Sequence, residues 1–216
     1  MQEQVNTFSP FGPVLHLTKI DPKYIEELNG VIETVKGKEE RDNAGNLAGR
    51  IFEQYDIEDL VSDACKNHIL RHAQTYGHDA GMEPYAIQLN GLWVNIQKEM
   101  EVNPMHSHSG MLSFVLYTKN ELTRAETLNN KFDKAGDKEL AGLLELHYGE
   151  DHFLSWSKYY HWPEVGDLII FPSWLRHFVF PHYEEGKERV SVAGNINPRV
   201  NAVSYTHLTL PTSDLV

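Results

Sequence analysis

The sequence predicts a mainly β domain, a sandwich or barrel, with helices at its N-terminal side. Apolar residues recur at helical spacing up to about residue 82, and from residue 84 the apolar pattern alternates with a period of two. Many short strand-like segments then follow one another, separated by turns such as 164–167 and 184–187. This succession of short strands and turns is typical of a sandwich or barrel, and a chain of 216 residues is long enough for one such core.

Two helices are expected in the N-terminal part. Asp21 is a suitable N-cap and Pro22 suits the first helical position, with the helix ending before Gly37. Its apolar positions are Ile25, Leu28, Ile32 and Val35. Residues 38–50 are polar and read as a loop, and a second helix is expected at about 57–76. His72 lies at the edge of the apolar stripe of that helix, so we interpret it as a partly buried helical histidine.

The strands follow from residue 84 onward. They are expected at 85–97, 111–118, 143–148, 167–171, 177–180 and 189–196. Gly91 interrupts the first of them, which indicates a bulge or a close approach of two backbones. Residues 120–142 are charged and partly helix-prone, so they are expected to form an insertion or lid.

Composition excludes several functional classes. The net charge of −12 argues against a broad nucleic-acid footprint, which requires a surplus of Lys and Arg. The single cysteine, Cys65, excludes a disulfide framework within the chain. No apolar run is long enough to cross a membrane, and the first 20 residues do not have the pattern of a secretory signal. Together these features favour a cytoplasmic protein.

Residues 203–216 read as the translation of a transposase adapter used in DNA library preparation. The alternative is a natural C-terminal strand, because Val203, Tyr205, His207 and Thr209 alternate. We therefore expect one native domain over 1–202, with a helical part at about 1–82, a β core at about 84–198 and a non-native tail.

Histidines in two segments are candidate metal ligands. His106 and His108 stand at i and i+2, so their imidazoles share one face if the segment is extended. His-x-His pairs also arise by chance in a chain with twelve histidines. His177 follows a buried apolar strand that ends in Pro172, which places it well for a third ligand, and His182 is the lower-ranked alternative.

A candidate anion receptor lies on the last strand. Arg189 and Ser191 alternate with Val190 and Val192, so the arginine and the hydroxyl share one face. A guanidinium that points into a barrel can bind a carboxylate through two parallel hydrogen bonds. The alternative is an arginine at the rim in a surface ion pair.

Taken together, His106-x-His108, then His177, then Arg189-x-Ser191 resemble the iron(II)/2-oxoglutarate-dependent oxygenase superfamily, and most closely its small stand-alone members. Trp93-x-Asn95 before the histidine pair and the apolar strand 113–117, which ends in Tyr117, add to the resemblance. The stretch 164–180 resembles the strand and loop that lead to the distal histidine in the superfamily. The resemblance extends over roughly residues 84–198.

The resemblance implies a double-stranded β-helix, the cupin-like jelly roll, with helices packed on one sheet. It implies Fe(II) at the open end, held by His106 and His177, with 2-oxoglutarate as cosubstrate and O₂ as oxidant. Arg189, aided by Ser191, would hold the distal carboxylate of 2-oxoglutarate, and Tyr117 and Asn95 would line its pocket. The activity implied is that of a dioxygenase, most simply a hydroxylase, with no catalytic residue beyond the metal site.

One position departs from the superfamily. Most members carry Asp or Glu where this chain has His108, so His108 is the candidate third ligand. Two alternatives stay open, namely a carboxylate supplied by Glu101 and an exogenous ligand in that position. Two other functions also stay open: a three-histidine cupin-type dioxygenase that does not use 2-oxoglutarate, and a non-catalytic jelly-roll binding protein.

The substrate is expected to be a small molecule or a peptide, and the sequence does not indicate an oligomeric state. Residues 120–142 and 156–162 are the segments expected to shape substrate entry. The aromatic cluster at 159–162 could stack a planar or peptide substrate, although ordinary packing is the preferred interpretation.

Overall fold

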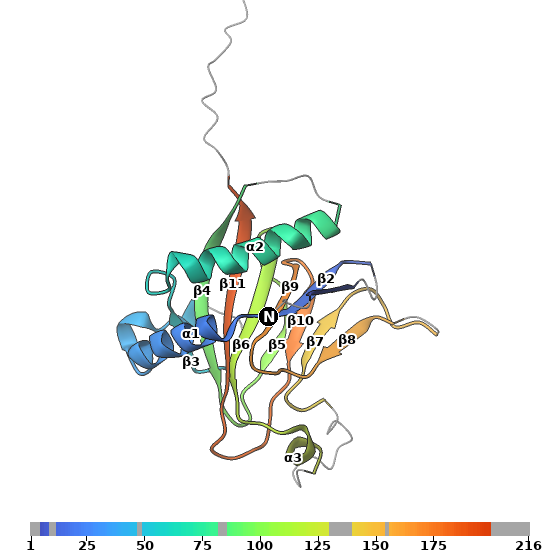
Figure 1. Ribbon diagram of the computed structural model, residues 1–216. Helices are drawn as coiled ribbons and strands as arrows, with labels where there is room; N and C mark the ends of the chain where they lie inside the picture. The colour runs from blue at the N-terminus through green and yellow to red at the C-terminus, as the bar shows by residue number, and fades with distance from the viewer. Residues whose placement is uncertain are drawn as a thin grey trace, which may run out of the picture.

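The computed structural model describes residues 5–8, 12–46, 49–81, 86–129, 140–153 and 156–199. In this part of the chain, two antiparallel sheets face each other and two helices cover the outer face of the larger sheet (Figure 1). The larger sheet has the order β1-β2-β9-β6-β11-β4-β3, and the smaller one has the order β5-β10-β7-β8. The fold is the predicted jelly roll, and the proposed tail at 203–216 lies outside the described residues.

The strands of the larger sheet are β1 (Val5–Phe8), β2 (Leu15–Lys19), β3 (Glu53–Asp56), β4 (Ile87–Gln97), β6 (Leu112–Asn120), β9 (Asp167–Pro172) and β11 (Arg189–Pro198). Those of the smaller sheet are β5 (Asn103–His106), β7 (Leu144–His147), β8 (Lys158–His161) and β10 (Arg176–Val179). All six expected strands are present. The sequence analysis missed β1, β2, β3, β5 and β8, which have only four or five residues each and therefore carry little periodic signal.

Helix α1 (Pro22–Val35) begins where it was predicted, with the Asp21 side chain accepting a hydrogen bond from the backbone N–H of Lys23. Helix α2 (Asp63–Asp79) begins about six residues later than predicted, because Ser62 caps it by accepting from the N–H of Cys65. Ile57 and Val61, in the turn before α2, are buried in the same core as the helix, so they continued its apolar pattern.

The described chain also contains three short helical segments. They are the 3₁₀ turns η1 (Glu39–Arg41) and η2 (Ala44–Asn46) and the helix α3 (Arg124–Asn129). The two turns lie in the predicted loop at 38–50, and α3 lies in the predicted insertion at 120–142. Among the described helices, none combines the length and the apolar character needed to cross a membrane.

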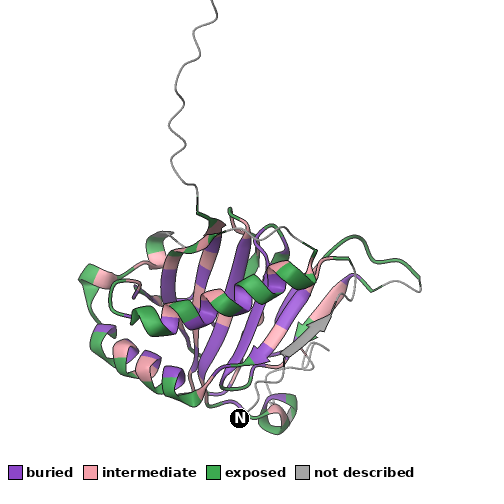
Figure 2. Ribbon diagram, turned by 45° about the horizontal axis from the view of Figure 1, so that its top comes forward, coloured by how far each residue is buried: buried purple, intermediate pink, exposed green. Residues whose placement is uncertain are grey.

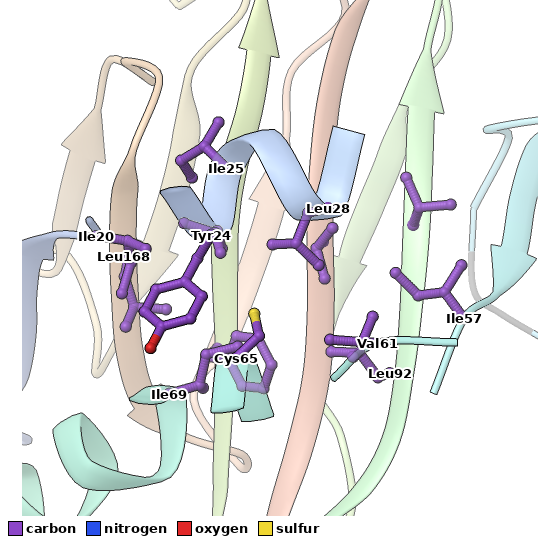
Figure 3. Close-up of a cluster of buried hydrophobic side chains, with 14 of the residues drawn as sticks. Ile20, Tyr24, Ile25, Leu28, Ile57, Val61, Cys65, Ile69, Leu92 and Leu168 are labelled. Atoms are coloured by element: carbon purple, nitrogen blue, oxygen red, sulfur yellow. The ribbon is translucent and has the colours of Figure 1, made fainter. Parts of the chain in front are cut away.

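Two layers of apolar side chains hold the domain together. The first lies between the larger sheet and helices α1 and α2, where Leu28 and Ile69 are fully buried against strand residues such as Leu92 (Figure 3). The second lies between the two sheets and includes Leu146 and Phe171. The central strands of the larger sheet are therefore buried, while the outer sides of the helices are exposed (Figure 2).

The predicted irregularity at Gly91 is a bulge. Along β11 the paired residues step from Gly194 to Ile196, while along β4 they step from Leu92 to Leu89, so β4 has one extra residue here. Gly91 has φ +99°, a conformation that glycine adopts without the strain that a Cβ imposes. The bulge lies at the end of β4 away from Arg189.

Candidate metal centre

Three imidazoles lie together between the two sheets. His106, His108 and His177 each offer one ring nitrogen, and these three atoms lie within 4.8 Å of one another. The ring centroids are 4.1 Å apart for His106 and His177, 4.9 Å for His106 and His108, and 5.1 Å for His108 and His177. The structure thus brings together the three residues that the sequence analysis selected.

The smaller sheet positions two of these histidines. His106 ends β5 and His177 lies in β10, and the two residues are direct partners in the antiparallel pair. His108 lies beyond the strand, where its backbone N–H donates to the carbonyl of Ser173 at 2.8 Å. Two rigid strands and one tethered loop therefore present the three rings.

Backbone carbonyls orient two of the rings. Nδ1 of His106 lies 2.7 Å from the carbonyl oxygen of Pro104, and Nδ1 of His177 lies 3.0 Å from that of Leu175. An imidazole that donates from Nδ1 to a carbonyl keeps the lone pair of Nε2 for a metal ion. Both rings are thus held in the tautomer that suits metal ligation through Nε2.

Burial keeps these imidazoles neutral. Burial, together with the neighbouring histidines, lowers the pKa of His177 to about 3 and that of His108 to about 4. Burial also lowers the pKa of His106. Because a histidine must be deprotonated to bind a metal, the three rings are in the required state near neutral pH. The donor set therefore fits a first-row divalent metal such as iron(II).

Arg189 is a buried cation in the same pocket. The residue is 3% exposed, and its guanidinium donates to the carbonyl oxygen of Gly142. In the described part of the chain no carboxylate pairs with it, and burial lowers its pKa. A buried guanidinium is costly unless an anion compensates it, so the pocket is suited to a negatively charged ligand.

The other predicted pocket residues surround this guanidinium. The Arg189 guanidinium lies 6.0 Å from the centre of the Tyr117 ring, and burial raises the pKa of Tyr117 to about 12, which keeps its hydroxyl neutral. Ser191 and Asn95 are direct partners on β11 and β4, and both line the pocket. All seven residues selected from the sequence therefore line one pocket.

Sequence analysis missed several residues of this pocket. Gln54, on the unpredicted strand β3, donates from Nε2 to Oδ1 of Asn95 at 2.8 Å. Trp93 lies 6.0 Å from His108, measured between ring centroids, and Asn103 also lines the pocket. Trp93 was part of the Trp93-x-Asn95 motif but was not selected as a pocket residue, and Asn103 lies close to the histidine pair in the sequence, whereas the short polar strand that carries Gln54 had no signal.

The alternative ligands lie elsewhere. The Glu101 carboxylate accepts hydrogen bonds from the backbone N–H groups of Lys98 at 2.8 Å and Phe52 at 3.4 Å. His182 is fully buried, with Nδ1 at 3.6 Å from Oε2 of Glu184. Neither residue belongs to the three-histidine cluster or lines its pocket.

Two residues of the aromatic cluster at 159–162, His161 and Trp162, make contacts within the protein. His161 pairs with Asp167 at 2.8 Å in a buried contact, and the guanidinium of Arg124 lies 5.1 Å from the centre of the Trp162 ring. Tyr160 is 38% exposed on the edge strand β8. Part of the predicted insertion, 130–139, lies outside the described residues.

Comparison with solved structures shows the same fold in enzymes. A prolyl-4-hydroxylase of Pseudomonas putida aligns over 92% of this chain and 95% of its own, with 16% identity and a TM-score of 0.51. The viral collagen prolyl hydroxylase of Paramecium bursaria Chlorella virus-1, solved as a 2OG complex, aligns over 89% and 94%, with 11% identity and a TM-score of 0.52. HygX of Streptomyces hygroscopicus, solved with iron bound, aligns over 86% and 82%, with 10% identity and a TM-score of 0.55.

At the level of sequence, no curated protein matches this chain. Residues 91–195 match the family described as "Putative 2OG-Fe(II) oxygenase". The matched segment begins at the bulge of β4 and ends on β11, so it contains His106, His108, His177 and Arg189. Residues 91–195 of the jelly roll are therefore similar to the 2OG-Fe(II) oxygenase family.

Proposed function

We propose that this protein is an Fe(II)/2-oxoglutarate-dependent dioxygenase, and specifically a hydroxylase. The observation that carries the proposal is the shared pocket of Arg189 and the three imidazoles. A dicarboxylic acid with one end at the ion and the other at a guanidinium accounts for both features at once. Neither feature alone distinguishes this function from a simple metal or anion site.

The residues of the chain have separate tasks in this proposal. His106, His108 and His177 hold the ion through neutral nitrogens, and Arg189 binds the distal carboxylate of 2-oxoglutarate. Ser191, Tyr117 and Asn95 line the space between them and orient the cosubstrate. When bound, iron(II) supplies the activation of O₂, with 2-oxoglutarate leaving as succinate and CO₂ while the substrate gains a hydroxyl group.

His108 makes the centre one unit more positive than a two-histidine, one-carboxylate centre. A neutral imidazole cannot neutralise any of the charge of Fe(II), so this chain should retain the ion less tightly than a carboxylate-bearing homologue. Glu101, whose carboxylate is engaged by backbone N–H groups, does not supply the missing charge. The dianion 2-oxoglutarate compensates the charge when it binds.

The substrate class proposed is a small molecule or a peptide. Two of the similar solved structures are prolyl hydroxylases, which act on prolyl residues, but their likeness to this chain is one of fold.

The proposed location is the cytoplasm. The single cysteine of the sequence, Cys65, is a free thiol buried in the helix–sheet core, which is compatible with a reducing compartment.

Turnover of 2-oxoglutarate without a substrate tests the activity. The wild type, loaded with Fe(II) in air, should form succinate, and His177→Ala should form none. The matched control is His78→Ala, because the side chain of His78 is 90% exposed on α2, away from the pocket. Equal rates of succinate formation in wild type and His177→Ala would defeat the proposal.

The three-histidine ligand set favours a second candidate, a dioxygenase that does not use 2-oxoglutarate. That function leaves the buried Arg189 without a role. Adding 2-oxoglutarate to the Fe(II) protein under anaerobic conditions separates the two candidates. A weak visible charge-transfer band is expected for the first and no change in the spectrum for the second.

A further inference from the structure

Asn103, which has no role in the function proposed above, faces the same centre as the three histidines. It begins β5 and lines the pocket, and its Nδ2 lies 3.5 Å from Nε2 of His106. Nε2 is the nitrogen that the carbonyl of Pro104 leaves available for a metal ion. The amide of Asn103 is therefore directed at the ligand side of His106.

A bulge in β5 produces this orientation. His106 and Asn103 are three residues apart, so in a regular strand their side chains would point to opposite faces. On β10, however, their partners His177 and Val179 are only two residues apart, and both line the pocket. The extra residue in β5 turns Asn103 to the face of His106, and the bulge contains Pro104, which has no N–H to give to the sheet.

A glycine holds the amide from the other side. Gly49 has φ +130°, and a Cβ built there would lie 2.6 Å from Oδ1 of Asn103. Only a residue without a side chain permits this approach. The segment at Gly49 thereby confines Asn103 against the pocket.

The amide of Asn103 has unused hydrogen-bonding capacity. Its Oδ1 is buried without a hydrogen-bond partner, and its Nδ2 has only the long contact to His106. The Nδ2 group carries two N–H donors, and among the described residues no oxygen accepts from it, so an acceptor oxygen of a ligand can supply the missing partner. An ion bound to Nε2 of His106 would occupy the lone pair that now faces Nδ2 of Asn103, so Nδ2 would then lose this contact.

We propose that Asn103 binds the cosubstrate, donating a hydrogen bond from Nδ2 to an oxygen of 2-oxoglutarate held at the ion. The inference rests on the proposed function, and it adds a binding residue on β5 to the receptor formed by Arg189 on β11. A hydrogen bond to a charged oxygen of this kind corresponds to roughly tenfold to a hundredfold in affinity.

Binding measurements with Co(II) in place of iron test the role of Asn103 without turnover. Asn103→Leu has nearly the same size but no hydrogen-bonding atoms. We expect its Co(II) affinity, read from the visible d–d bands, to stay within about threefold of wild type. Its 2-oxoglutarate affinity, measured by calorimetry on the Co(II)-saturated protein, should fall by roughly tenfold to a hundredfold.

Two further variants complete the experiment. Asn103→Ala replaces Asn103→Leu if the leucine disturbs folding, and Asn67→Leu, on the exposed side of α2, is the control for an Asn-to-Leu change. Unchanged 2-oxoglutarate affinity overturns the inference and leaves the proposed function intact. An equal loss of Co(II) and 2-oxoglutarate affinity overturns it in favour of a structural role. Failure of the wild type to bind 2-oxoglutarate overturns the proposed function as well.

Discussion

His106 and His177 are direct partners across the β5–β10 strand pair, and their ring centroids are 4.1 Å apart. The backbone ladder therefore fixes the spacing of these two imidazoles before any ion binds. His108 is placed differently, by one backbone hydrogen bond from the loop to Ser173. The site thus combines a preorganised pair with a third ring whose identity can be changed at small structural cost.

His108, the third candidate ligand, is the first residue to substitute. We expect His108→Ala to weaken Co(II) binding by more than the roughly 100-fold that loss of an outer-shell partner can cost, because a ligand itself is removed. His108→Asp should bind Co(II) more tightly than the wild type, since a carboxylate cancels one unit of the ion's charge. Titration of the metal-free proteins with Co(II), followed by visible absorption, measures both effects.

The order of the three proteins is the result that matters. Wild type should fall between His108→Asp and His108→Ala. Equal affinity of His108→Ala and wild type would show that His108 is not a ligand. Ser109→Ala, an exposed neighbour in the same loop, should match the wild type.

Arg189 should determine cosubstrate affinity and leave metal affinity unchanged. Arg189→Gln removes the guanidinium, and with it a paired hydrogen bond to a carboxylate, so 2-oxoglutarate should bind on the order of a hundredfold more weakly. Ser191→Ala, which removes a single neutral hydroxyl, should cost about tenfold or less. Calorimetry on the Co(II)-saturated proteins gives both values, and unchanged binding by Arg189→Gln would remove the central support for 2-oxoglutarate.

Much of this site was predictable from local sequence. The pair His106 and His108 shares a motif, and Arg189 and Ser191 share a strand face, so spacing alone indicated which side chains cooperate. The prediction that the histidine pair, His177 and Arg189 form one site came from the resemblance to a family, because no local pattern indicates that β5 pairs with β10. That pairing depends on contacts between residues about 70 positions apart.

What sequence reasoning missed has a common physical cause. β5 and β3 have four residues each and are partly polar, so neither shows a period, yet they contribute Asn103 and Gln54 to the pocket. A regular strand would even have directed Asn103 away from His106, and only the bulge reverses it. The start of α2 was predicted too early for a different reason. Ile57 and Val61 are buried in the turn before the helix, and their spacing of four residues resembles that of a helix.

Acid should destabilise the fold through His72, which is buried between α2 and β2. Its ring centroid lies 5.0 Å from that of His68 and 5.7 Å from that of His16. Burial, followed by these two neighbours, lowers the pKa of His72 from 6.5 to about 4. Above pH 6.5 the ring is neutral in both the folded and the unfolded protein, so it does not lower the free energy of unfolding. As the pH falls from 6.5 towards 4, the unfolded state takes up the proton first, and the free energy of unfolding falls by up to about 3 kcal/mol.

Urea unfolding of the metal-free protein at pH 7 and pH 4.5 measures this loss. The metal-site histidines add their own pH dependence, but they are present in every variant and cancel in the difference. His72→Leu should lose less stability between the two pH values than wild type does, whereas the exposed control His78→Gln should match the wild type. Identical pH dependence in His72→Leu and wild type would contradict this role.

Gly194 should tolerate no side chain without a loss of stability, because β11 and β4 approach each other closely at the bulge. A Cβ at this position would lie 2.6 Å from the carbonyl oxygen of Gly91 and 2.8 Å from Cε1 of Phe114. The first of these neighbours is backbone and the second is a fully buried ring, so neither can move without disturbing the core. Gly194→Ala should therefore lower the free energy of unfolding by about 1–3 kcal/mol, the usual cost of overpacking.

The matched control is Gly30→Ala, in the interior of α1. A Cβ there meets nothing within 4 Å, and alanine is the better helix former, so this variant should gain about 0.5–1 kcal/mol. Urea unfolding of both variants at pH 7 should therefore give changes of opposite sign. Because Gly194 also lines the pocket, Co(II) binding by the folded fraction of Gly194→Ala gives a second reading. A stability equal to wild type in Gly194→Ala would mean that the two strands separate at the bulge without cost, contrary to the close contact described here.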